Sequence, residues 1–138
     1  MDTDLIPITF NKIMQSRTYT VIILGTAQKR FAIYTDPHVG RNIQRYLTDQ
    51  QKKRPFTHDL LNSIFKGLNV KILQIVIHDI ADTIYFARLF LQQEHSGQKT
   101  IIEIDIRPSD AITLALLSHA PLFCKKELLE KVPPVEEY

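Results

Sequence analysis

The chain has 138 residues, of which 44% are hydrophobic, and a net charge of +2 at pH 7 with histidine neutral. This size and apolar content are typical of one domain, here 1–138, that buries roughly 68% of its unfolded surface. The apolar runs are short, far below the roughly 20 residues of a spanning helix, so no membrane contact is expected. The start of the chain lacks the basic segment, apolar stretch and cleavage site of a secretory signal, which predicts a cytoplasmic protein.

Three strands and one helix are predicted in the first 50 residues. The strands, at 5–14, 18–24 and 30–35, show loose alternation or an enrichment in β-branched residues. A helical apolar stripe begins after Asp36-Pro37, with proline in its first turn. We expect this helix to end by about Gln50, because the polar segment that follows leads into a proline.

The second half of the chain is predicted to contain two more helices and a further group of strands. Thr57 is a credible N-cap for a helix whose apolar stripe is Leu61, Ile64, Phe65 and Leu68. A strand pair at 70–78 and 83–91 is expected around a turn at 79–82, and another strand at 100–106. A helix at 109–118 is apolar nearly all round and should be buried. A short strand at 121–124 and a frayed tail at 133–138 complete the prediction.

The order of these elements predicts the fold class. Three strands, two helices, three strands and a helix lack the strict alternation of a doubly wound fold. We therefore expect an α+β domain with a mixed, mainly antiparallel sheet and about three helices packed on it.

The single cysteine, Cys124, excludes an internal disulfide and a multi-cysteine zinc cluster. It lies in an apolar run, which favours a buried structural thiol. Lys125 and Lys126 follow it directly, so a reactive thiol stays open as the minor alternative.

The strand before the third helix carries a candidate hydrolytic constellation. Alternation places Glu103, Asp105 and Arg107 on one face of this strand. Two carboxylates roughly 7 Å apart suit a water molecule or a divalent ion, with an arginine beside them for an anionic oxygen. A solvated strand face with an Asp–Arg ion pair explains the same residues.

Polar residues also open the second and third helices. Ser109 and Asp110 in one helix, and Thr57 and Asp59 in the other, suit the free amides and positive dipole of a helix start, so capping accounts for them. His58 is different, because an imidazolium gains nothing at a positive helix end, whereas a neutral imidazole can act as a base or ligand.

Basic residues gather in the first half of the chain. Residues 1–69 hold 10 Lys/Arg and 5 Asp/Glu, whereas residues 70–138 hold 7 and 10. Lys29-Arg30 and the 52–54 cluster could contact a polyanion, and solvated turns explain them equally well. The chain lacks GxGxxG, Walker and GxSxG patterns, which argues against nucleotide-cofactor chemistry.

Three separated motifs resemble the bifunctional nuclease family, also called the DNase/RNase domain. They are Arg-Pro-Phe-Thr-His-Asp-Leu-Leu at 54–61, Ile-Tyr-Phe-Ala-Arg-Leu at 84–89 and Glu-Ile-Asp-Ile-Arg-Pro-Ser-Asp-Ala-Ile at 103–112. The segment 120–123 also resembles the family pattern. The resemblance covers about residues 18–132 in one colinear stretch.

The resemblance implies an α+β homodimer to which cleavage of DNA and RNA has been ascribed. The family's Thr-His-Asp and Arg-Pro-Ser-Asp positions correspond to residues 57–59 and 107–110. One position departs from the family, because Val39 stands where the family has a glutamate at the start of the first helix. If that glutamate binds metal or activates water in the family, the activity is expected to be weakened or lost here unless Asp36 or His38 substitutes for it.

The leading hypothesis is a metal-assisted phosphodiesterase that acts on nucleic acid. Its predicted site residues are His58 as base, Asp59 from the same motif, Arg107 for the phosphate charge, and Asp105 and Asp110 as ligands of Mg²⁺ or Mn²⁺. Lys29, Arg30 and Arg54 are the predicted contacts to backbone phosphates.

Two alternatives remain open. In the first, the domain is a dimeric binding or regulatory module, catalytically weak or inactive, whose motifs only cap helices and build the core. In the second, it hydrolyses a small phosphorylated molecule in a closed pocket.

Overall fold

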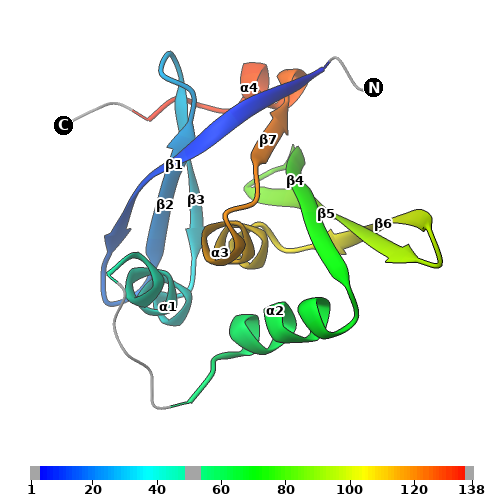
Figure 1. Ribbon diagram of the computed structural model, residues 1–138. Coiled ribbons are helices and arrows are strands. Elements are labelled where there is room, and N and C mark those ends of the chain that lie inside the picture. The colour runs from blue at the N-terminus through cyan, green and yellow to red at the C-terminus, as the bar shows by residue number, and fades with distance from the viewer. Residues whose placement is uncertain (1–3, 49–53, 136–138) are drawn as a thin grey trace.

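The structure is a computed structural model that describes residues 4–48 and 54–135, and in these ranges it contains seven strands and four helices (Figure 1). The strands are β1 (Leu5–Gln15), β2 (Thr20–Gly25), β3 (Arg30–Thr35), β4 (Val70–Ala81), β5 (Ile84–His95), β6 (Gln98–Ile106) and β7 (Leu122–Lys125). The helices are α1 (Pro37–Leu47), α2 (Thr57–Gly67), α3 (Pro108–Ser118) and α4 (Lys126–Lys131). None of these helices is long and apolar enough to cross a bilayer.

All seven strands belong to one sheet in the order β3-β2-β1-β7-β4-β5-β6. Neighbouring strands are antiparallel except for β4 and β7, which are parallel. Figure 1 shows the two halves of the sheet, β1–β3 and β4–β6, spread apart around α3. The predicted α+β fold with a mixed, mainly antiparallel sheet is confirmed.

The core is built around α3. Ala111, Ile112 and Leu114 on this helix are buried, as expected of a helix that is apolar nearly all round. The hydroxyl of Thr113 is also buried and donates to the Ser109 carbonyl at 2.8 Å, which satisfies it inside the core. Cys124 is fully buried, and this burial raises the pKa of its thiol to about 11. Cys124 is therefore a structural thiol, as the apolar run predicted.

Several predicted boundaries are wrong. The turn expected at 79–82 belongs largely to β4, because β4 and β5 pair up to Ala81 and Ile84, with bulges that absorb irregular spacing. The short helix α4 was not predicted, because six residues are too few to show a helical period. Residues 133–135 were expected to fray, but the Val135 amide donates to the Arg30 carbonyl at 2.8 Å. Residues 136–138 lie outside the described ranges.

The predicted caps at Thr57 and Ser109 are wrong. Thr57 is the first residue of α2, and its N-cap is Phe56, whose amide donates to the Asp59 carboxylate at 2.8 Å. Asp59 therefore reaches back to cap the helix start. Ser109 is buried in the first turn of α3, whose N-cap is Arg107 without a side-chain cap bond. The proline at the first position of α3 has no amide to satisfy and has a backbone angle suited to a helix, which lessens the need for a cap there.

The start of α1 is fixed against the sheet by a polar clamp. Gln15 on β1 donates to the Pro37 carbonyl at 2.7 Å and accepts from the Thr20 hydroxyl of β2 at 2.8 Å. Gly40 packs directly on this pair, and a Cβ at this position would clash with both side chains. Glycine is therefore required for this close approach.

We predict that Gly40→Ala destabilises the domain by about 1–3 kcal/mol, because the added methyl group must displace Gln15 and Thr20. The measurement is urea denaturation followed by circular dichroism. Gly67→Ala is the matched control, since nothing lies within 4 Å of a Cβ there, and it should be neutral or stabilising by up to about 1 kcal/mol. Equal stability of Gly40→Ala and the natural chain would contradict the clamp.

Candidate active site

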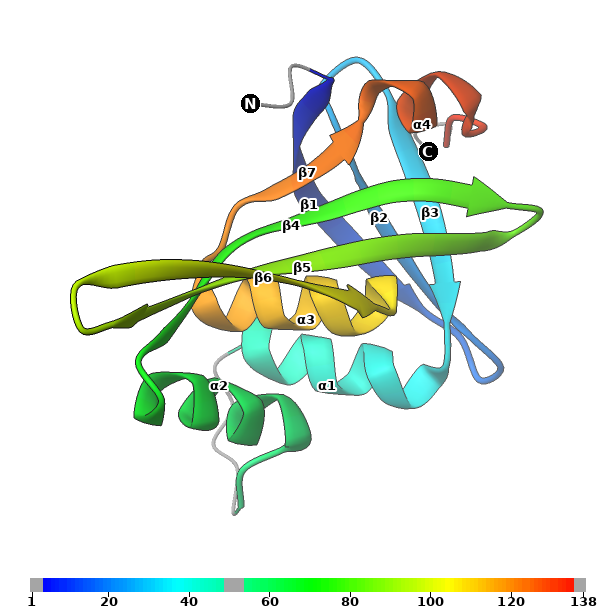
Figure 2. The ribbon, with the colours of Figure 1, turned by 90° about the vertical axis from the view of Figure 1, so that its right-hand side faces the viewer.

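The first turns of three helices meet at one cleft. Figure 2 shows α1, α2 and α3 lying below the sheet with their first turns at the same side. A cleft of about 400 Å³ is lined by His38, Val39 and Asn42 of α1, by Thr57, His58 and Leu61 of α2, and by Ile106, Arg107, Asp110, Thr113 and Leu114 in and before α3. Free amides and the positive dipole end of each helix favour an anion, and here three such ends face one space.

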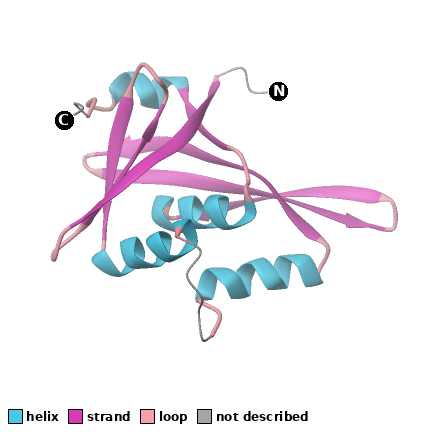
Figure 3. Cartoon of the chain, turned by 60° about the vertical axis from the view of Figure 1, so that its left-hand side comes forward, coloured by secondary structure: helices cyan, strands magenta, loops and turns pink. Residues whose placement is uncertain are grey.

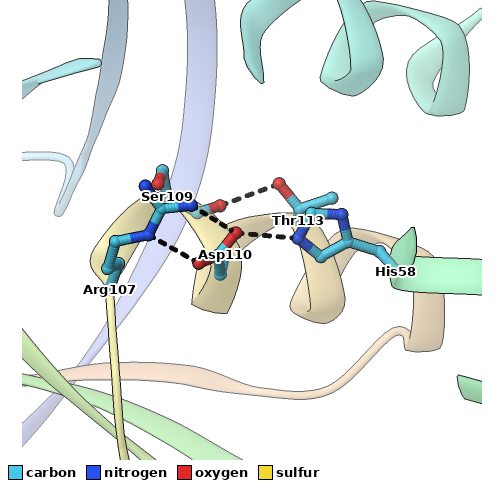
Figure 4. A network of polar contacts seen from close by, with 5 residues as sticks. All are labelled: His58, Arg107, Ser109, Asp110 and Thr113. Carbon is cyan, nitrogen blue, oxygen red and sulfur yellow. Dashed lines mark hydrogen bonds and ion pairs between the residues drawn. The ribbon is translucent and has the colours of Figure 1, made fainter. Parts of the chain in front are cut away.

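Asp110 joins two of these helices. One of its carboxylate oxygens lies 2.9 Å from Nε2 of His58, 52 residues earlier in the chain (Figure 4). The other oxygen accepts from Nε of Arg107 at 2.8 Å, and Nη2 of Arg107 lies 3.2 Å from the first oxygen. The side chains of His58 and Asp110 are 13% and 25% exposed. The carboxylate is therefore held in a partly buried position by two donors.

These contacts fix the proton positions in the cluster. The hydrogen bond from His58, together with the hydrogen bond and charge of Arg107, lowers the pKa of Asp110 to about 2, although burial opposes the shift. An ionised carboxylate can only accept, so Nε2 of His58 carries a proton. The lone pair of a neutral His58 ring is then on Nδ1, which is buried without a hydrogen-bond partner among the described residues. Nδ1 is thus the basic atom of the cluster.

Arg107 forms the exposed side of the cluster. Its side chain is 68% exposed, so N–H groups that do not contact Asp110 face solvent. The hydrogen bond and charge of Asp110 raise the pKa of Arg107, and Asp36 adds to this effect. A permanently charged guanidinium with free donors suits a phosphate group.

The structure brings His58, Arg107 and Asp110 together but leaves Asp105 and Glu103 apart from them. Ile106 lines the cleft, so alternation along β6 turns Asp105 to the opposite face of the sheet. There the charge of Asp105 acts on His78, and Glu103 lies 3.8 Å from Arg88 in an exposed ion pair. Arg107 does not share this strand face, because it is the N-cap of α3.

The positions of Asp105 and Asp110 argue against the predicted divalent cation between them. Asp105 and Asp110 lie on different faces of the sheet, and both oxygens of Asp110 already accept hydrogen bonds. In residues 4–48 and 54–135, no group of three or more His, Cys, Asp or Glu side chains is placed to hold a metal ion. The two carboxylates do not fit one divalent cation within this chain.

Asp59, the other predicted acid, is part of the helix scaffold. Besides capping α2, it lies beside Tyr46 of α1, where burial and this carboxylate raise the pKa of the tyrosine hydroxyl to about 12. The Tyr46 ring packs edge-on against Phe56, with centroids 6.2 Å apart. Asp59 does not line the cleft, and its contacts tie α1 to the start of α2.

The predicted phosphate contacts lie in three different places. The Lys29 ammonium donates to the Leu129 and Glu130 carbonyls, so it binds the last turn of α4. Arg30 lines a cleft on the outer face of β1–β3. Arg54 is exposed four residues before His58, and of the three it is the one next to the first turn of α2.

The position that departs from the family pattern lies inside the cleft. Val39 lines it and packs against the core. His38 lines the same cleft, and Asp36 at the N-cap of α1 acts on Arg107 through its charge. Asn42 also lines the cleft but was not predicted. The spacing of His38 and Asn42, four residues on one helix, was the signal that could have revealed it.

Comparison with known proteins gives one family and two relatives. The bifunctional nuclease domain matches residues 21–136 of the chain. Two uncharacterized proteins of Mycobacterium tuberculosis, MT1877 and Rv1829, are each 26% identical over 76 residues. The matched segment covers 55% of this chain and only 42% of each relative.

We predict that Asp110 makes the stability of the domain dependent on acid pH. Its pKa is about 2 in the folded chain and about 3.9 when unfolded. A lowered pKa contributes stability that is complete above about pH 5 and is lost as the pH falls from about 4 to 2. Urea denaturation should show the stability gap between the natural chain and Asp110→Asn shrinking by about 2 kcal/mol over that range. A gap that stays constant with pH would contradict the ion-pair geometry.

Proposed function

Because the chain belongs to the bifunctional nuclease domain family, we propose that it hydrolyses phosphodiester bonds of DNA and RNA at the cleft that contains His58, Arg107 and Asp110. The observation that carries this proposal is the His58–Asp110–Arg107 cluster at the point where three helices begin. A phosphodiester is an anion, and its hydrolysis requires charge neutralisation at phosphate and a base for the nucleophile. The cleft offers both kinds of group.

Each side chain has a distinct role in this proposal. The exposed N–H groups of Arg107 and the free amides of the helix starts bind the phosphate oxygens. Asp110 accepts from Nε2 of His58 and so keeps the lone pair on Nδ1, which takes the proton of the attacking water or hydroxyl. The attacking oxygen bonds to phosphorus, the P–O bond to the leaving oxygen breaks, and the proton passes from the imidazolium to that leaving oxygen. Because Nδ1 is buried, substrate binding must open the wall of the cleft around His58. This opening is part of the proposal.

A divalent cation remains a prediction for the reaction, since Mg²⁺ or Mn²⁺ would neutralise charge on the phosphate. The pair Asp105 and Asp110 does not fit such an ion within one chain. The steps proposed for this chain therefore use its own side chains.

Three observations favour a second candidate function, a catalytically weak or inactive dimeric module that binds or regulates. Both oxygens of Asp110 are neutralised by neighbouring donors, and the basic atom of His58 is buried. In addition, Val39 occupies the position of the family glutamate. A site in which the charged groups neutralise each other can serve structure alone.

We predict that His58→Ala and Asp110→Ala each lower kcat at least about 100-fold, because each removes part of the proton-transfer pair. The assay follows cleavage of single-stranded DNA and RNA by purified protein with Mg²⁺, with Mn²⁺ and with EDTA. Asp105→Ala is the matched carboxylate control and should retain activity, since Asp105 lies on the other face of the sheet.

Unchanged activity in both His58→Ala and Asp110→Ala would sink the proposed site. An equal loss of activity in Asp105→Ala would instead favour Asp105 and Asp110 as the functional pair of carboxylates. If the natural chain is inactive and Val39→Glu gains activity, the second candidate function is supported.

The family resemblance also implies a homodimer, and an apolar surface supports it. Leu60 and Ile64 on α2 and Leu68 at its C-cap form an exposed stripe, although Ile64 and Leu68 were expected to face the core. Ile102 and Ile104 on the edge strand β6 are also exposed, on the side that faces the helices. Figures 1 and 3 show the β5–β6 hairpin projecting beyond the helices, with α2 below it. We propose this α2–β6 surface as the interface between two copies.

We predict that Ile64→Lys converts a dimer to a monomer, because it places a charge in the apolar surface. Sedimentation velocity of both proteins at the same concentration measures the change. Met14→Lys, at a comparably exposed residue of β1 (48% against 44% for Ile64), is the control and should leave the dimer intact. A monomeric natural chain, or a dimeric Ile64→Lys variant, would contradict this interface.

A further inference from the structure

Two residues connect the candidate active site with two further clefts. Arg107 lines both the active-site cleft and a neighbouring cleft of about 600 Å³ between β3 and the β4–β5 turn. Tyr34 lines this second cleft and also a third, of about 320 Å³, on the outer face of β1–β3. The three clefts thus form a continuous series that runs from His58 past the edge of the sheet.

Tyr34 is an exposed aromatic residue at the middle of this series. It lies on β3, which is an edge strand of the sheet, and it is 68% exposed. The ring of Tyr19 is 5.7 Å away at an interplanar angle of 58°. Alternation along β3 places Arg30, Ala32 and Tyr34 on the outer face, where all three line the third cleft. Tyr34 and Tyr19, both exposed, therefore place two adjacent aromatic rings on this path, which is a surface suited to stacking.

The charges along the series suit a polyanion. Among the described residues that line the second and third clefts, none is acidic, whereas Lys12, Arg30 and Arg107 are basic. Basic residues contact the phosphates of a nucleic acid, and aromatic rings between them stack on its bases. A polyphosphate has no base to stack on Tyr34, so the aromatic ring favours a nucleic acid.

The length of the path exceeds one nucleotide. Arg30 and Tyr34 are four residues apart on β3, and a strand rises about 3.3 Å per residue, which gives about 13 Å between them. A ligand that contacts Arg30, Tyr34 and also Arg107 must therefore extend over several nucleotide units. In a duplex the bases are paired and stacked on each other, so only a single strand can place a base on Tyr34.

We propose that Tyr34 is a base-stacking residue that positions single-stranded DNA or RNA along the path from the third cleft to the active site. This inference rests on the proposed nuclease function and narrows its substrate class to single strands. The strand lies over β3 with its phosphates near Lys12, Arg30 and Arg107, and one base stacks on the Tyr34 ring. The phosphate beside Arg107 is then the one presented to His58.

Binding measurements test this proposal separately from catalysis. Fluorescence anisotropy of a labelled single-stranded oligonucleotide, and of its duplex, is recorded in EDTA. Tyr34→Ala should weaken binding of the single strand at least about fivefold, as expected when one stacking contact is lost. Tyr34→Phe keeps the ring and should bind like the natural chain. Phe86→Ala, an exposed aromatic residue on the β4–β6 half of the sheet, is the control and should also bind normally.

A second measurement observes the stacking directly. The chain contains no tryptophan, so the indole in Tyr34→Trp would be the sole tryptophan signal, and stacking of a base should quench it. Quenching by the single strand without cleavage activity would support the proposed path while the nuclease function fails. Cleavage with no quenching, or with Tyr34→Ala binding as tightly as the natural chain, would overturn the proposed path alone. Stronger binding of the duplex than of the single strand would also overturn it.

Discussion

The carboxylate of Asp110 is the contact on which the arrangement of the site depends. It lies on α3, the buried helix around which the two halves of the sheet are spread. A partly buried charge requires partners, and those partners are His58 on α2 and Arg107 at the end of β6. Because α2 has no fully buried residue, it is held in place by the partly buried Leu61 and Phe65, which pack against the core, together with the bond from His58 to Asp110. The same contacts of Asp110 that build the cleft also set which nitrogen of His58 carries the proton.

Sequence patterns predicted the elements well because apolar periodicity reports directly on burial. The alternation in β6 and the all-round apolar α3 both predicted the right secondary structure. His58 and Asp110 were each predicted as site residues, but the bond between them could not be predicted, since 52 residues separate them and no local spacing records such a contact. Alternation also placed Asp105 and Arg107 on the strand face opposite to Ile106. It could not show that the strand ends before Arg107 and that this residue is the N-cap of a helix.

Failures of prediction occurred where two physical solutions compete locally. A polar residue at a helix start can cap the helix itself, as expected for Thr57. Alternatively, the residue three positions after the N-cap can reach back, as Asp59 does to the amide of Phe56. Apolar residues can face the core or another surface, so Ile64 and Leu68 fit the helical stripe and still lie exposed. The same ambiguity arises at an edge strand. Ile102 and Ile104 follow the alternation of a strand with one buried face, but among the described residues nothing covers them. These exposed positions become informative only when seen together in space.

The place of β7 in the sheet has a consequence for how the chain folds. This strand of four residues lies between β1 and β4 and pairs with both, so it joins the two halves of the sheet. On a ribosome, residues 5–106 emerge first and can form two separate antiparallel units, but the sheet closes only when residues 122–125 arrive. Contacts between segments so distant in sequence form slowly. Until then β1 and β4 expose open edges, which makes the nascent chain prone to wrong strand pairing during the interval before β7 emerges.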